Sequence, residues 1–262
     1  MKKLLVNGCS FTAGSWQHID DRSNWSIGTN IRVYVDPRAL SYVPRISPIV
    51  WSRHLEDKFE NVYNLGKGGK GNDRIVRTTL DYCNNNDMTD YVAIIQWTSP
   101  FRTEYWNPED NEWVNVVINN GLRGNWTLDI PSEPNTKRKK LQTLAYDNEM
   151  KWLNSFNDYD IAYYNNVLVL QNFFENKQIP YMFTSMSDLD HPFRKRKIYE
   201  TMPTTTELNL KKLIDKSKWT KESLSSYNMD NYISQEDRHP NLKGNKLIAQ
   251  ALFKELMEKY GR

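Results

Sequence analysis

The chain opens with the stretch Lys3-Leu4-Leu5-Val6-Asn7-Gly8-Cys9-Ser10-Phe11-Thr12, an apolar run that ends at a glycine and a serine. The apolar run predicts a first strand over Lys3–Asn7, and the small residues after it can begin a helix. A serine at this point lies at the carboxyl end of a parallel strand, where open α/β sheets bind their ligands. The Ser10 hydroxyl is therefore the first candidate for chemistry.

The rest of the chain alternates strand-like and helix-like segments. Strands are expected at 61–65, 91–97 and 179–185. Helices are expected at 49–59, where Ser47-Pro48 precedes the helix, and at 147–176. Two more helices are expected after capping residues, one from Asn72 to Cys83 and one after Asn241. This alternation predicts an α/β fold with a parallel sheet covered by helices on both faces. A single domain over 1–262 is expected, with no linker long enough to divide it.

Three long insertions, at about 15–46, 101–146 and 186–236, each follow a predicted strand. They should therefore crowd the carboxyl edge of the sheet, where a site is expected. Within the middle insertion, 112–118 is expected to form a hairpin with 125–130. Several tryptophans lie in the polar insertions, and their amphipathic rings suit sugars as well as a packed loop.

Composition excludes several classes of function. A net charge of +3 from 35 basic and 32 acidic residues is too balanced to indicate a nucleic-acid or membrane partner, and the basic block at 137–140 suits a solvated loop. Two cysteines make neither a disulfide framework nor a zinc site. The first apolar run is too short for a signal peptide, and no run approaches the ~20 residues of a membrane helix. A cytoplasmic protein is expected.

A second motif lies just before the last predicted helix. Asp237-Arg238-His239-Pro240 supplies an acid and an imidazole, which together can activate a serine hydroxyl by accepting its proton. Glu236 is an alternative to Asp237 as the acid. The stretch Asp188-Leu189-Asp190-His191-Pro192 offers His191 as a second candidate base. Gly66, Gly68 and Gly71 have the spacing of a dinucleotide fingerprint, but they follow the second strand, so nucleotide binding is disfavoured.

In this order the motifs resemble the SGNH (GDSL-type) hydrolase family, and the combination is similar to its phage-encoded members. The resemblance implies a flavodoxin-like, three-layer α/β/α fold and hydrolysis of an ester without cofactor or metal. Ser10 matches the nucleophile of the Gly-Asp-Ser block, with Cys9 in place of the aspartate. His239 matches the base, held by Asp237 or Glu236. Gly69 best matches the oxyanion glycine that follows Asn64, with Gly66 and Gly68 as alternatives.

The third family block differs. The family has an oxyanion asparagine after the third strand, whereas this chain has Gln96-Trp97-Thr98-Ser99. Thr98 or Ser99 can donate a hydroxyl there, but losing the amide can cost ~10²–10³ in rate. Candidate substrate-binding residues beside these blocks are Asn72, Trp97 and Arg102. The preferred substrate is a short acyl ester on a small molecule or carbohydrate; the alternatives are an inactive binding module for a sugar or protein, and an assembly protein.

Overall fold

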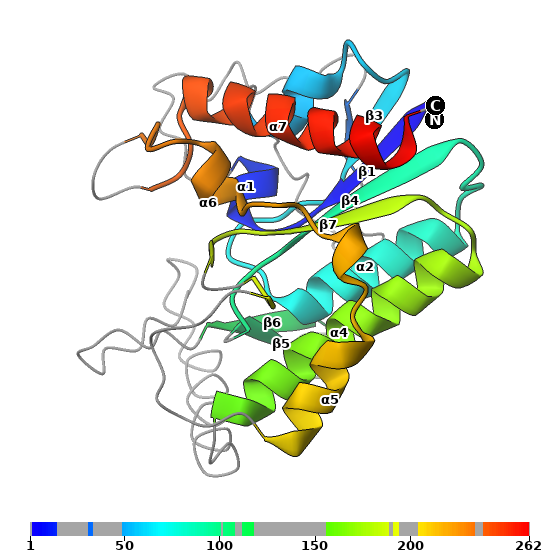
Figure 1. The fold of residues 1–262 in the computed structure, drawn as a ribbon, viewed down its shortest axis with the longest axis vertical. Helices are drawn as coiled ribbons and strands as arrows, with labels where there is room; N and C mark the ends of the chain where they lie inside the picture. Colours follow the sequence, from blue (N-terminus) through cyan, green and yellow to red (C-terminus); the bar gives the residue numbers. More distant parts are fainter. Residues whose placement is uncertain are drawn as a thin grey trace.

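The computed structural model describes residues 2–14, 31–33, 49–100, 102–107, 112–117, 156–188, 191–193, 204–233 and 238–261. Its centre is a five-stranded sheet, in the order β2 (Ile31–Val33), β3 (Asn61–Asn64), β1 (Lys3–Asn7), β4 (Tyr91–Trp97) and β7 (Tyr181–Ser185) (Figure 1). All four pairings are parallel. β4 is buried along its whole length, as expected of a central strand with both faces covered.

Four of these strands have the flavodoxin-like arrangement. Leaving out β2, their chain ranks run 2-1-3-4 across the sheet, as in the doubly wound order that starts 2-1-3-4. Where the flavodoxin-like order has a fifth strand beside β7, the described residues form a single parallel bridge between Phe183 and Trp219. Next to this bridge, the Thr220 N–H donates to the Phe183 carbonyl at 2.9 Å.

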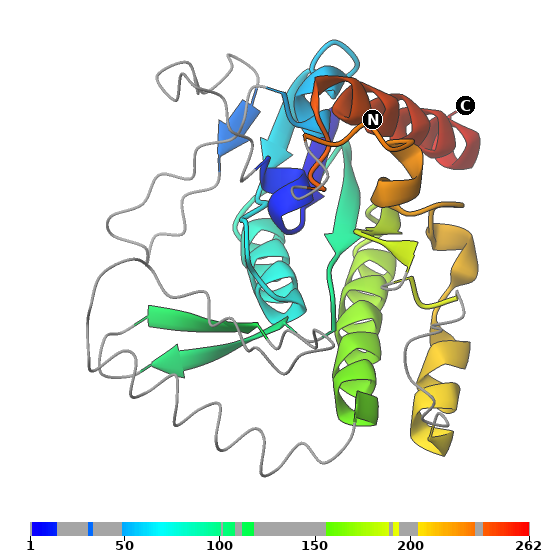
Figure 2. The same cartoon turned by 90° about the vertical axis from the view of Figure 1, so that its left-hand side faces the viewer.

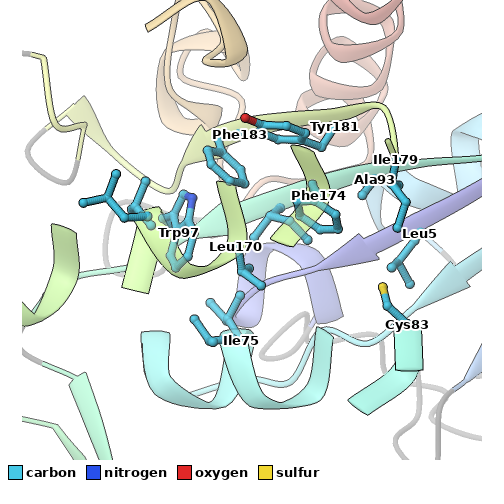
Figure 3. Close-up of a cluster of buried hydrophobic side chains, with 14 of the residues drawn as sticks. Leu5, Ile75, Cys83, Ala93, Trp97, Leu170, Phe174, Ile179, Tyr181 and Phe183 are labelled. Atoms are coloured by element: carbon cyan, nitrogen blue, oxygen red, sulfur yellow. The ribbon is translucent and has the colours of Figure 1, made fainter. Parts of the chain in front are cut away.

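Two separate cores cover the two faces of the sheet. On one face, α2 (Asn72–Asn84) and α4 (Phe156–Asn176) pack over β4 and β7, and Figure 3 shows the aromatic part of this cluster around Phe174, Tyr181 and Phe183. On the other face lie α1 (Ser10–Ala13), the 3-10 helix η2 (Trp51–Leu55), α6 (Leu224–Tyr227) and α7 (Leu242–Tyr260). The predicted three-layer α/β/α fold is confirmed.

The last helix begins where its sequence predicts. The Asn241 side chain accepts a hydrogen bond from the Gly244 N–H at 3.0 Å, which satisfies one of the open donors of the first turn of α7. Near its start, α7 also lies very close to the preceding loop, because a side chain at Gly244 would place its Cβ 2.5 Å from the Asn231 carbonyl oxygen.

Other expected elements are corrected. Instead of the helix expected over 49–59, the structure has only the short η2. The capping residue of α2 is Gly71, and Asn72, which was expected to be the cap, is the first residue of the helix. α4 is described from Phe156, so the expected helical residues 147–155 lie outside the described part. The strand expected at 112–118 does form, as β6 (Glu112–Val117), but it pairs with β5 (Arg102–Asn107). Residues 125–130, its expected partner, lie outside the described ranges; an adjacent strand four residues away closes a hairpin more readily.

The third insertion adds secondary structure between β7 and α7. It contains α5 (Thr205–Leu213), which packs on α4, and the 3-10 helix η4 (Lys216–Lys218) before α6. Among the described helices, none is both long and apolar enough to cross a membrane.

Candidate active site

The Ser10 hydroxyl lies where β1 turns into α1. Cys9 is extended, and Ser10 is the first residue of the helix, 5% exposed. Gly8 is required in this turn because an added Cβ would lie 2.5 Å from both Gln96 Oε1 and Thr12 Oγ1. The sequence therefore brings a small, mostly buried hydroxyl to the carboxyl edge of the sheet.

The His239 imidazole lies directly against this hydroxyl. Its Nε2 atom is 2.8 Å from Ser10 Oγ, within the range for proton transfer between a base and a nucleophile. Its ring centroid is 5.2 Å from that of Phe11. In Figure 2 the segment before α7, coloured orange to red, runs close to α1, coloured blue. The structure thus joins the two chain segments that the sequence analysis singled out.

The backbone around His239 is fixed from two sides. Its carbonyl accepts the Ile233 N–H at 2.9 Å, and Pro240 forms an antiparallel bridge with Tyr232. The side chain of Asn245, on α7, donates to the Pro240 carbonyl at 2.9 Å. A short loop and the first turns of α7 therefore determine where the imidazole lies.

The acidic member of the site stays a prediction. Asp237 and Glu236, the two candidate acids, lie outside the described residues.

The residues expected to bind an oxyanion are only partly placed. Gly69 has a φ of 71°, a backbone conformation that favours glycine, in the loop between β3 and α2. Thr98 is fully buried, and its hydroxyl is 4.0 Å from Met186 Sδ. Whether either group faces a substrate remains a prediction.

Asn72 has a different set of contacts from those expected. Its Nδ2 donates to the carbonyls of Thr98 and Ser99 at 3.1 and 3.2 Å, and its Oδ1 accepts the Thr98 N–H at 3.0 Å. The amide therefore does not cap α2, and its role in substrate binding stays a prediction. It fixes the backbone at the end of β4 against the start of α2.

Trp97 does not fit the predicted substrate-binding role. Its side chain is fully buried, and its ring packs edge-on against Tyr163 and Phe183 in the aromatic core (Figure 3). The alternation of side chains along β4 directs it away from the face that carries α1. Arg102 begins β5 and is partly exposed; its N–H donates to the Ser99 carbonyl at 3.3 Å, and its role stays a prediction.

His191, the second candidate base, packs in a separate aromatic group. Its ring lies 5.2 Å from Trp219 and 5.9 Å from Phe193, centroid to centroid. Its Nδ1 accepts the Phe193 N–H at 3.3 Å, and its Nε2 is 3.4 Å from the Thr220 carbonyl. The imidazole in contact with Ser10 is that of His239.

Sequence analysis named Asn64 as the residue before the oxyanion glycine, but it did not predict the contacts that the buried polar residues behind the site make. Asn64 Nδ2 donates to the Thr12 carbonyl at 2.7 Å, and Asn7 Nδ2 donates to the Ile75 carbonyl and to the hydroxyls of Thr78 and Thr79. Gln96 contacts Cys9 and Thr12. A polar residue inside an apolar strand could have indicated these contacts, because a buried polar group must be hydrogen bonded.

A cavity of about 540 Å³ lies at the opposite edge of the sheet. It is lined by residues that precede β4 and β7, among them Asp87, Met88, Asp90, Lys177 and Gln178. These residues include neither Ser10 nor His239. The proposed site therefore rests on the contact between two side chains and not on the size of a cavity.

Comparisons with known proteins leave the family open. No family model matches the chain, and no curated protein does. One similar solved structure is a candidate lipolytic protein of the G-D-S-L family from Desulfitobacterium hafniense, at 12% identity and a TM-score of 0.40, covering 97% of this chain and 99% of that one. Another is an alpha/beta hydrolase enzyme from the metagenome of Lake Arreo, Spain, at 12% identity and a TM-score of 0.45, covering 97% and 94%. At these values neither likeness carries an argument about function. The similarity to phage-encoded proteins stays a prediction.

Proposed function

We propose that the protein is a serine hydrolase of the SGNH type that cleaves a short acyl ester through an acyl-enzyme intermediate. The observation that carries this proposal is the 2.8 Å separation between His239 Nε2 and Ser10 Oγ. A serine hydroxyl is a weak nucleophile until a neighbouring base accepts its proton, and this distance allows that transfer.

In the first step, Ser10 Oγ forms a bond to the acyl carbon while its proton passes to His239 Nε2. The tetrahedral intermediate then collapses, the bond to the leaving alcohol breaks, and His239 returns the proton to the departing oxygen. In the second step a water molecule gives its proton to His239 and attacks the acyl carbon. Breakage of the bond to Ser10 Oγ, which regains a proton, releases the acid.

The negative charge of the intermediate needs hydrogen-bond donors. The backbone N–H of Ser10, in the first turn of α1, is one proposed donor, and the N–H of Gly69 is another. Asp237 or Glu236 is proposed to hold the imidazole in the tautomer that leaves Nε2 free to accept a proton. A small-molecule or carbohydrate acyl ester remains the proposed substrate class, based on the tryptophans of the insertions.

Hydrolysis of p-nitrophenyl acetate tests this proposal. Ser10→Ala removes the nucleophile, so we expect turnover to fall by at least ~10³-fold with no loss of folded protein. Ser225→Ala is a matched control: Ser225 lies on α6, its hydroxyl contacts that of Ser223, and its N–H donates to the Met186 carbonyl. Equal turnover by wild type and Ser10→Ala would refute the proposal.

A binding module with the same fold is the second candidate. The observation that favours it is at the third block, where Asn72 uses its amide on Thr98 and Ser99, and the Thr98 hydroxyl lies near Met186. A fluorophosphonate probe separates the two candidates. Labelling of the wild type but not of Ser10→Ala supports the enzyme, whereas a folded wild type that is not labelled supports the binding module.

A further inference from the structure

We infer that Gln96 is the positioning residue for the nucleophile, a role that rests on the proposed function. Gln96 lies on β4, next to β1 in the sheet, and its side chain is fully buried. It acts on Ser10 through the residues on either side of it, and has no contact with the serine itself among the hydrogen bonds of the described residues.

The Gln96 amide bonds to both ends of the turn that carries Ser10. Its Oε1 accepts the Cys9 N–H at 3.1 Å and the Thr12 hydroxyl at 2.9 Å. Its Nε2 donates to the Trp97 carbonyl at 2.9 Å and lies 3.2 Å from Cys9 Sγ. Ser10 lies between Cys9 and Thr12, so one amide group ties the residue before the nucleophile and the helix after it to the centre of the sheet.

The orientation of this amide is determined by its partners. The Cys9 N–H can only donate and the Trp97 carbonyl can only accept, so the oxygen must face Cys9 and the nitrogen must face Trp97. A rotation of the amide by 180° would break both bonds. In a fully buried position such unpaired groups are costly, which makes a single arrangement strongly favoured.

Close packing adds to the constraint. The position of a Cβ on Gly8 is 2.5 Å from Gln96 Oε1 and 2.8 Å from Gln96 Cβ. The glutamine side chain therefore fills the space beside Gly8 and prevents the turn from moving toward β4. Gln96 is proposed to supply the polar contacts that hold this turn.

The test uses a glutamine elsewhere in the chain as a matched control. Gln171, on α4, is also buried, and it too bonds a backbone carbonyl and a backbone N–H, those of Leu213 and Asp215. Gln96→Met and Gln171→Met each remove one such pair of bonds, and Gln96→Met also removes the bond from the Thr12 hydroxyl. We expect Gln96→Met to lower kcat for p-nitrophenyl acetate by at least ~10-fold with KM within about threefold, since misplacement by about 1 Å can cost ~10²-fold. Gln171→Met should leave both constants near those of the wild type.

A second pair of variants applies if Gln96→Met does not fold. Thr12→Val removes the hydroxyl that donates to Gln96 while keeping the side-chain shape, and Thr12→Ser keeps the hydroxyl. We expect Thr12→Val to lower kcat about threefold or more, and Thr12→Ser to restore it. If folded Gln96→Met, or both Thr12 variants, have the kcat of the wild type, the inference is overturned while the proposed function stands. A wild type with no Ser10-dependent hydrolysis overturns the proposed function and this inference together.

Discussion

The two edges of the parallel sheet differ in how they use buried polar groups. At the carboxyl edge, Gln96 and Asn64 use their amides to join β4 and β3 to the turn around Ser10. At the amino edge, Tyr82 and Tyr91 pair with each other, Cys83 is buried beside them, and the 540 Å³ cavity is lined by connecting loops. The 540 Å³ cavity lies at the amino edge, whereas the contact that suits chemistry lies at the carboxyl edge.

We therefore base the proposed site on the network of oriented side chains around Ser10 and not on the cavity at the amino edge. A nucleophile must be held within a fraction of an ångström, and hydrogen bonds from neighbouring strands provide that restraint. The amino edge has no described hydroxyl–imidazole pair of this kind. Substitutions in the hydrogen-bond network around Ser10 should therefore change activity, and substitutions at the amino edge should change stability alone.

The largest expected effect distinguishes two histidines. His239→Gln removes the base from Ser10, and we expect kcat/KM for p-nitrophenyl acetate to fall by at least ~10³-fold, by analogy with other serine hydrolases. His191→Gln alters the aromatic group with Trp219 and should keep activity within about threefold while lowering the melting temperature. If folded His191→Gln lost most of its activity while His239→Gln stayed active, the base would be His191 and the assignment to His239 would be wrong.

The next effect concerns the turn before the nucleophile. Gly8→Ala would place a Cβ 2.5 Å from Gln96 Oε1 and Thr12 Oγ1, and such overpacking should lower the free energy of unfolding by about 3 kcal/mol. Chemical denaturation measures it. In a Gln96→Ala background part of the clash disappears, so the cost of Gly8→Ala should fall by about 1 kcal/mol or more. If the losses of stability from Gly8→Ala and Gln96→Ala simply add in the double variant, the two side chains do not contact each other in this turn.

A smaller effect tests the amino edge by pH. Burial raises the pKa of the Cys83 thiol from 9.0 to about 12. The folded state then holds this proton more tightly than the unfolded state, so its contribution is complete below pH 9 and stability falls as the pH rises toward 12. Between pH 8 and 10.5 the thiol should account for a loss of about 2 kcal/mol.

Cys83→Ala isolates that contribution. The variant loses packing at every pH, but its free energy of unfolding should fall less steeply than that of the wild type over this range. Burial also raises the pKa of Tyr82 and Tyr91, so part of the slope should remain. Identical slopes for the two proteins would mean that Cys83 titrates alike in the folded and unfolded states.

The smallest effect concerns the helix that follows the base. Asn241→Ala removes the bond from the Gly244 N–H and the bond to the Tyr232 carbonyl, which should cost about 1 kcal/mol of stability. Lys243→Ala, an exposed position in the same turn, is the control and should stay within about 0.5 kcal/mol. Equal melting temperatures for Asn241→Ala and the wild type would argue against a stabilising cap.

The parts of the fold that depend on local pattern could be predicted from the sequence. β4 has the bounds expected from its apolar run, and α7 begins after Asn241, because strands and caps are encoded by neighbouring residues. The pairing of β6 with β5 was not predicted, since the hydrophobic pattern alone does not choose a partner strand. The contact between His239 and Ser10 was expected only because the order of the motifs along the chain resembles that of a known family.

The supporting contacts could not be predicted in the same way. Asn72 looked like a helix cap, yet its amide bonds to residues 26 and 27 positions later in the chain. Trp97 looked available to a substrate, yet it lies in the core. Such roles depend on which segments meet in three dimensions, and a spacing pattern does not contain that information.

The most direct test of the central claim is covalent labelling with a fluorophosphonate, followed by peptide mass spectrometry. The account predicts one adduct, on the peptide that contains Ser10, absent in Ser10→Ala and formed at least ~10²-fold more slowly in His239→Gln. An adduct on another residue, or an equal rate of Ser10 labelling without His239, would contradict it.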